Sequence, residues 1–110
     1  MLRGKDRSYL KSLANNLKPL AQIGKSGISD GLINQLDKLL EDHELVKINV
    51  LQNSPDEAKN MTEEILNRTG AEFVQQIGSK ITIYRESKEN KQIEFDRNWY
   101  GKNWNYGWYF

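Results

Sequence analysis

An alternation of apolar and polar side chains over residues 45–51 restricts the fold of this chain more than any other stretch does. The apolar members are Val46, Ile48 and Val50, and the polar members between them are Lys47 and Asn49. Successive side chains of a strand point to opposite faces, so this segment has one apolar face and one polar face. We therefore expect a sheet with one covered face and one face in contact with water, unlike the wholly apolar strands of a doubly wound sheet.

Apolar residues at helical spacing predict two helices in the first half of the chain. Asp6 is expected to cap the first helix, which ends before Pro19. A second helix is expected over residues 30–43, with Ser29 as its N-cap. The apolar stripes are Tyr9, Leu10, Leu13 and Leu17 in the first helix, and Leu32, Ile33, Leu36, Leu39 and Leu40 in the second.

Ser54, Pro55 and Glu57 predict the start of a third helix. Ser54 is a favourable N-cap, Pro55 suits the first helical position, and Glu57 completes a capping box. Gly70 is expected to end this helix, because glycine readily adopts the left-handed conformation after the last turn.

The predicted strands span residues 20–23, 45–51, 72–77 and 80–85. Gly78-Ser79 suits a two-residue hairpin turn between the last two strands. In the last strand, Ile81 and Ile83 are expected to face inwards, and Thr82 and Tyr84 outwards.

The expected order of elements is therefore α-β-α-β-α-β-β. Right-handed crossovers make the first three strands parallel where they share a sheet, and the hairpin adds an antiparallel strand. We predict an α/β fold, a two-layer sandwich with a four-stranded mixed sheet. The order of the strands within the sheet is left open.

Composition indicates one domain of a cytoplasmic, monomeric protein. A chain of 110 residues suits a single domain. It contains no cysteine, which fits a reducing compartment, and it shows no apolar run that suggests a membrane span or a signal peptide.

Charge is distributed unevenly, although the net charge is only +1. Residues 1–29 contain six Lys or Arg and one Asp, whereas residues 30–64 contain three Lys and nine acidic residues. The basic members of the first segment are Arg3, Lys5, Arg7, Lys11, Lys18 and Lys25. A basic face of this kind favours a polyanionic partner, and a solvated mixed surface is the other interpretation.

A Gly-x-x-Gly sequence at residues 24–27 is the principal candidate for a binding site. Two glycines three residues apart permit a sharp turn and leave no Cβ to keep a ligand away. Lys25 adds a cation at the tip, and the start of the following helix favours anions. Loops of this kind clamp the nucleic-acid backbone in KH domains. An ordinary tight turn is the alternative interpretation.

Other kinds of site are poorly supported. A nucleotide-binding P-loop needs a glycine five residues before Gly24, where this chain has Pro19. A Ser or Cys hydrolase needs a histidine base, but the only histidine is His43, at a predicted helix end that suits a structural role. One histidine and no cysteine disfavour a zinc site. We therefore expect no enzymatic activity, no metal and no cofactor.

Segments spread over residues 2–95 match one family pattern in the right order. They are Leu10-Lys11-Ser12-Leu13-Ala14, Leu17-Lys18-Pro19, Ile23-Gly24-Lys25-Ser26-Gly27-Ile28, His43-Glu44-Leu45-Val46-Lys47-Ile48, Thr69-Gly70-Ala71, Gln76-Ile77-Gly78 and Ile81-Thr82-Ile83-Tyr84-Arg85. Together they resemble the CRM domain (chloroplast RNA splicing and ribosome maturation), above all its bacterial stand-alone form, the YhbY-like RNA-binding proteins.

The resemblance implies RNA binding, association with a precursor of the large ribosomal subunit, and a KH-like use of the glycine loop. By motif position, the RNA-binding residues are Gly24, Lys25, Ser26 and Gly27. Further candidate contacts, expected from charge to share a face with the loop, are Arg7, Lys11, Lys18 and Lys47. A carboxylate introduced at either glycine is expected to weaken RNA binding and to leave folding nearly unchanged.

A second hypothesis is a protein-interaction module on ribosome precursors. It would meet ribosomal proteins or a GTPase through the acidic face of the helix over residues 30–43. The carboxylates near the end of this helix, such as Glu41, Asp42 and Glu44, are otherwise expected to form a solvated face.

A CRM-like domain is expected over residues 1–95, followed by an aromatic-rich tail over residues 96–110. Residues 99–110 contain seven aromatic residues, among them all three tryptophans. Such a tail either folds back over an apolar part of the domain or presents aromatic rings on which RNA bases stack. The family pattern says nothing of its role.

Truncation after Asp96 distinguishes the two roles of the tail. Loss of a docked tail should lower the free energy of unfolding, because each buried aromatic side chain contributes roughly 1.5–3 kcal/mol. Loss of a stacking tail should leave Tm unchanged and weaken RNA binding. In the full chain, blue-shifted tryptophan emission without RNA would indicate docking, and red-shifted emission quenched by RNA would indicate stacking. An unchanged Tm together with unchanged RNA binding would contradict both roles.

Overall fold

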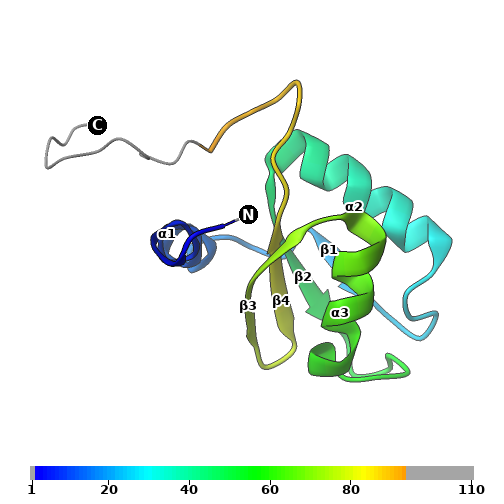
Figure 1. The fold of residues 1–110 in the computed structure, drawn as a ribbon. Helices are drawn as coiled ribbons and strands as arrows, with labels where there is room; N and C mark the ends of the chain where they lie inside the picture. Colours follow the sequence, from blue (N-terminus) through cyan, green and yellow to red (C-terminus); the bar gives the residue numbers. More distant parts are fainter. Residues whose placement is uncertain (1, 94–110) are drawn as a thin grey trace, which may run out of the picture.

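In a computed structural model, which describes residues 2–93, the predicted order of three helices and four strands is confirmed (Figure 1). The elements are α1 (Gly4–Ala14), β1 (Ala21–Ile23), α2 (Asp30–His43), β2 (Leu45–Val50), α3 (Ala58–Thr69), β3 (Glu72–Ile77) and β4 (Lys80–Tyr84). The predicted boundary at residue 95 and the aromatic segment 99–110 lie outside the described residues. In the described part of the chain, no helix is long and apolar enough to cross a bilayer.

The four strands form one mixed sheet in the order β1-β2-β4-β3. β1 pairs with β2 in parallel, and β4 is antiparallel to both β2 and β3. The connection through α2 makes the first two strands parallel, and the predicted hairpin turn forms at Gly78, whose φ is 58°. β4, the last strand within residues 2–93, is therefore an inner strand, whereas β3 lies at an edge.

α2 and α3 cover one face of the sheet and bury the main apolar core against it (Figure 1). The predicted stripe of α2 packs here, and Leu36 and Leu40 are fully buried. The residues that meet it from the sheet are Ala21, Ile23, Val46, Ile48, Val50, Ile81 and Ile83, and those from α3 are Ala58, Met61 and Ile65. The alternation in β2 thus places its apolar side chains against the helices, as expected.

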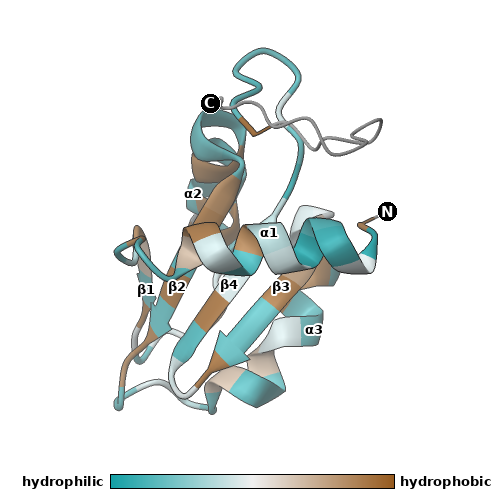
Figure 2. Ribbon diagram, turned by 90° about the vertical axis from the view of Figure 1, so that its left-hand side faces the viewer, coloured by the Kyte–Doolittle hydropathy of each residue, from teal (hydrophilic) through white to brown (hydrophobic). Residues whose placement is uncertain are grey.

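α1 lies on the opposite face of the sheet and crosses only one end of it (Figure 2). A second apolar cluster forms beneath it from Leu2, Leu10, Ala14, Leu45, Val74 and Tyr84. Thr82 and Tyr84 alternate with Ile81 and Ile83 and lie on the second face, as expected, but both are buried, and Tyr84 belongs to the cluster beneath α1. Tyr9, expected in the apolar stripe of α1, is 46% exposed.

The predicted caps of α1 and α3 are wrong in detail. α1 begins at Gly4, and Asp6 lies in its first turn, where its carboxylate accepts a hydrogen bond from the Arg3 amide at 3.2 Å. α3 begins at Ala58 instead of Pro55, and no capping box forms there.

The loop before α3 is organised by Asp56. Its Oδ1 accepts hydrogen bonds from the Asn60 side-chain amide and from the Glu57 backbone amide, both at 2.8 Å. These bonds favour the ionised carboxylate and lower the pKa of Asp56. The end of α3 is as predicted, since Gly70 follows it with a φ of 72°.

Glu44 ends α2 and has no exposed surface. Its φ of 67° turns the chain directly into β2. Its carboxylate accepts three backbone hydrogen bonds, from the amides of Ser87 at 2.8 Å, Gln92 at 2.6 Å and Ile93 at 2.7 Å. The segment after β4 is thereby held across the end of α2, and Ile93 packs against the cluster beneath α1.

The expected solvated face at this end of α2 is therefore wrong for Glu44, which is buried, and for Glu41, which is half-buried, whereas Asp42 is exposed as expected. Glu41 accepts hydrogen bonds from the Ser87 hydroxyl at 2.8 Å and from the Lys88 amide at 3.0 Å. These bonds lower the pKa of Glu41 from its ordinary value. Residues 87–93 of the same chain donate hydrogen bonds to the Glu41 and Glu44 carboxylates. Both carboxylates belong to the acidic face of α2 that the interaction hypothesis requires.

Glu44→Gln should lower the free energy of unfolding by roughly 1–3 kcal/mol, because a neutral amide replaces a charged acceptor among buried N–H groups. Urea unfolding followed by circular dichroism measures this change. Asp42→Asn, at an exposed position on the same end of α2, is the matched control and should unfold like the parent. Equal stability of the two variants would show that the carboxylate does not hold residues 87–93.

Candidate nucleic-acid interface

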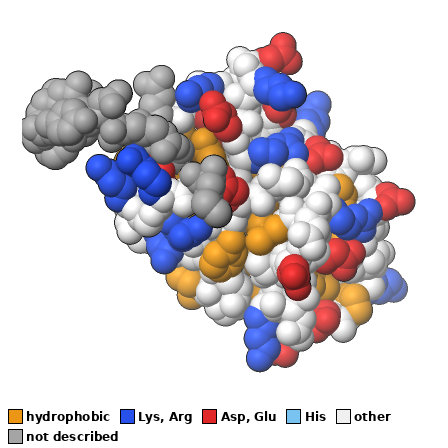
Figure 3. Space-filling model, viewed as in Figure 1, with side chains coloured by type: hydrophobic (Ala, Val, Ile, Leu, Met, Phe, Trp, Pro, Cys, Tyr) orange, Lys and Arg blue, Asp and Glu red, His pale blue; other side chains and the backbone are white. Residues whose placement is uncertain are grey.

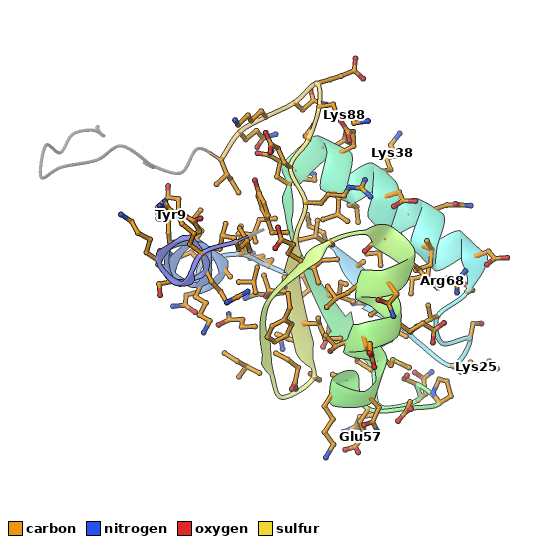
Figure 4. The ribbon with its side chains drawn as sticks, viewed as in Figure 1. Tyr9, Lys25, Lys38, Glu57, Arg68 and Lys88 are labelled. Atoms are coloured by element: carbon orange, nitrogen blue, oxygen red, sulfur yellow. The ribbon has the colours of Figure 1, made fainter. Side chains whose placement is uncertain are left out.

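The Gly-x-x-Gly loop lies at the carboxyl end of β1 and leads into α2. It forms a turn closed by a hydrogen bond in which the Gly27 amide donates to the Gly24 carbonyl oxygen, at 3.0 Å. Lys25 and Ser26 occupy the corners of this turn and are exposed. Lys25 lies at the edge of the molecule in Figure 4, so a large ligand can reach the tip of the loop.

The two glycines of the loop meet different surroundings. Gly27 is buried with a φ of 63°, and a Cβ there would lie 2.9 Å from Cγ of Pro55. A Cβ at Gly24 would make ordinary contacts with the side chains of Asn53 and Leu51, at 3.7 and 3.9 Å. The expectation that a substitution leaves folding nearly unchanged is therefore wrong for Gly27, whereas nothing around Gly24 contradicts it.

The start of α2 is held by Ser29 and Arg68. The Ser29 hydroxyl oxygen accepts a hydrogen bond from the Leu32 amide at 3.1 Å, which confirms Ser29 as the N-cap. Arg68 of α3 forms an ion pair with Asp30 and donates to the Ile28 carbonyl oxygen (Figure 4). Sequence reasoning missed Arg68, because no local pattern links α3 to the start of α2.

Lys18 and Lys47 lie toward the side of the sheet that α2 and α3 do not cover. Lys47 is half-buried in β2, between two residues whose side chains belong to the opposite core. Lys18 is exposed in the linker between α1 and β1. This linker runs beside β2, since the Leu20 amide donates to the Lys47 carbonyl oxygen at 2.9 Å.

Arg7 and Lys11 lie on α1, and the structure does not bring them together with the loop. In Figure 4, α1 (marked by Tyr9) and Lys25 lie on opposite sides of the molecule. Lys and Arg side chains gather over α1 in Figure 3. Arg7 is half-buried and its Nε donates to the Phe73 carbonyl oxygen at 3.1 Å, which joins α1 to β3. The expected single basic face is therefore divided, because Arg7 and Lys11 lie on α1, on the other side of the molecule from Lys25.

His43 is the last residue of α2 and is exposed. An imidazole at a helix end interacts favourably with the helix dipole. Among residues 2–93, no three His, Asp or Glu side chains are grouped so that they could hold a metal ion. The glycine loop remains the best-formed candidate site in this part of the chain.

Gly27→Ala should destabilise the domain by about 1–2 kcal/mol, because alanine must adopt the left-handed conformation and its Cβ meets Pro55. Thermal unfolding should show a lower Tm. Gly24→Ala is the matched control and should change stability by no more than about 0.5 kcal/mol. A parental Tm for both variants would show that the packing of Pro55 does not restrict the loop.

Comparison with known proteins identifies the family to which the chain is similar. A family model described as the CRS1 / YhbY (CRM) domain matches residues 2–85. The chain is 44% identical over 94 residues to Probable RNA-binding protein YqeI of Bacillus subtilis, covering 86% of this chain and 98% of that protein. It is 32% identical over 90 residues to an RNA-binding protein of Haemophilus influenzae, covering 82% and 91%.

A solved structure agrees with this assignment. The solution structure of the hypothetical protein SAV1595 from Staphylococcus aureus matches with a TM-score of 0.72 and 54% sequence identity. The match covers 86% of this chain and 98% of that one. The chain therefore belongs to the CRS1 / YhbY (CRM) domain family.

Proposed function

We propose that this protein binds ribosomal RNA in a precursor of the large ribosomal subunit, as a monomeric, cytoplasmic assembly factor without enzymatic turnover. RNA as the partner is supported by the family and by relatives named as RNA-binding proteins. The geometry of residues 24–27 supports the contact most directly, because the turn presents an exposed cation beside an exposed hydroxyl group at the edge of the molecule.

The loop contacts the sugar-phosphate backbone of the RNA. The absence of a side chain at Gly24 lets the backbone approach the turn, and Lys25 supplies a positive charge. The Ser26 hydroxyl is a hydrogen-bond donor for a phosphate oxygen. Contacts of this kind position an RNA strand without selecting its sequence.

The distribution of charge orients the RNA. The acidic residues of positions 30–64 lie in α2 and α3 or directly beside their ends, as Asp30, Asp37, Glu41, Asp42, Glu44, Asp56, Glu57, Glu63 and Glu64. The helical layer also carries Lys38, Lys59 and Arg68, but its net charge is negative, so it is less favourable for a polyanion than the loop and the side of α1. This polarity directs RNA to the loop and to the sheet face opposite α2 and α3.

The interaction hypothesis loses support from the same structure. Glu41 and Glu44 bind residues 87–93 of the chain, and Asp37 forms an ion pair with Arg85 at 2.9 Å. A partner protein would have to compete with these contacts.

Gly24→Asp should weaken binding to a protein-free ribosomal RNA fragment by about tenfold, because it places a carboxylate where a phosphate approaches. Lys25→Gln should lower the slope of log affinity against log salt by about 0.7, the contribution of one single-strand phosphate contact. Fluorescence anisotropy over a series of salt concentrations measures both. Lys59→Gln, at an exposed position on α3, is the matched control and should bind like the parent. Parental affinity in a folded Gly24→Asp variant would mean that the loop is only a turn.

Crosslinking in cells followed by RNA sequencing tests the identity of the RNA. We expect crosslinks in precursors of the large-subunit ribosomal RNA, and we expect Gly24→Asp to reduce them. Binding to protein-containing particles but not to protein-free RNA would instead support the interaction hypothesis.

A further inference from the structure

The half of the sheet that α1 leaves uncovered lies at the same end of the strands as the glycine loop (Figure 2). Pairing between strands places the side chains of this half in two rows, which we call the open sheet face. One row is Gln22, Asn49, Lys80 and Ile77, and the other is Lys47, Thr82 and Gln75, of which Thr82 is buried. Because Gln22 is followed by Ile23 and then the loop, the first row adjoins the loop.

The open sheet face combines cations with amide side chains. Gln22 and Lys80 are exposed, and Lys47, Asn49 and Gln75 are half-buried. No Asp or Glu stands in either row. The acidic helical layer lies on the opposite face of the sheet, so this face attracts a polyanion without local repulsion.

Amide side chains suit the edges of unpaired bases. Each amide offers both donors and an acceptor, which is what the Watson–Crick edges of bases require. The Ser79 hydroxyl donates to Oδ1 of Asn49 at 3.1 Å, which restricts the Asn49 side chain before any ligand arrives. Ile77, 64% exposed at the end of the first row, adds an apolar surface against which a base can pack.

The dimensions of the face favour a single strand over a duplex. Neighbouring strands are about 4.8 Å apart, so the four strands extend over about 15 Å. α1 bounds this surface on one side (Figure 2). In a duplex, the Watson–Crick edges of the bases are paired with each other, and a protein meets mainly the backbone and the shallow groove. The amide side chains of the open sheet face could not hydrogen-bond to those paired edges.

We propose that the open sheet face binds the unpaired bases of a single-stranded RNA segment whose backbone is held by the loop at residues 24–27. This inference rests on the proposed function of the loop. The ammonium groups of Lys47 and Lys80 contact phosphates, while the amides of Gln22 and Asn49 contact base edges.

The test compares two RNAs of the same composition, a single strand of about 12 nucleotides and a fully paired hairpin. The double variant Gln22→Ala/Lys80→Gln changes only exposed side chains of the open sheet face. The matched control Gln35→Ala/Lys59→Gln makes the same chemical changes at exposed positions of α2 and α3. Affinity is measured by fluorescence anisotropy, and circular dichroism confirms that each variant is folded.

We expect the parent and the control to prefer the single strand by about tenfold, and the double variant to lose most of that preference. Its salt slope for the single strand should fall by about 0.7, because one phosphate contact is removed. A parent without preference, or a double variant that keeps the preference, overturns the inference.

Gly24→Asp separates this inference from the proposed function. If Gly24→Asp weakens binding while Gln22→Ala/Lys80→Gln behaves like the parent, the loop binds RNA and the open sheet face does not. If Gly24→Asp and the double variant both bind single strands like the parent, the proposed function of the loop fails, and the inference fails with it.

Discussion

The buried carboxylate of Glu44 holds together the end of the molecule opposite the glycine loop. Backbone amides of residues 87–93 converge on its two oxygens, and its main-chain carbonyl oxygen accepts from the Arg85 amide at 3.0 Å. A charge without exposed surface is tolerated only with partners of this kind. The same contacts bring Ile93 to the apolar cluster beneath α1, so one interaction closes the end of α2 and one end of the second sheet face.

Closure of one end leaves polar side chains exposed at the other end of the sheet, where we propose that RNA binds. Near Glu44, the side chains of this face are engaged within the protein. The apolar ones pack in the cluster beneath α1, and Arg7 donates to the Phe73 carbonyl oxygen. At the opposite end, Lys80 and the loop present polar groups to solvent. These polar groups lie outside the main core, so they remain exposed without interrupting its apolar packing.

Local signals predicted the elements well, and contacts between distant segments explain the errors. α2 with its cap at Ser29 has the predicted bounds, because its stripe and its cap lie within one stretch of sequence. Pro55 has the propensity of a first helical residue, yet α3 starts later, and Pro55 packs beside Gly27. Glu44 resembled a solvated residue because its partner Ser87 lies 43 residues further along the chain.

The same difference between local and distant contacts explains which parts of the candidate site can be predicted from the sequence. The loop was recognisable from two glycines and a lysine in four residues, whereas the grouping of the basic residues depends on the side of the sheet that α1 occupies. A helix that precedes the first strand can pack on either face of a sheet, and its position follows from the pairing of apolar surfaces far apart in the chain. Charge alone therefore predicts for Arg7 and Lys11 a face that they do not share with the loop.

Pro55 and Arg68 determine how the loop is presented to a ligand. The rigid ring of Pro55 packs where only a glycine fits at position 27, and Arg68 joins the start of α2 to α3. Held from two sides, the turn would lose little conformational freedom on binding a phosphate, as we propose. Only the long side chain of Lys25 has to be ordered, and a single ammonium charge does not distinguish one base from another. On this proposal, any preference for particular bases comes from the surface beside the loop, where amide side chains stand in rows on the sheet.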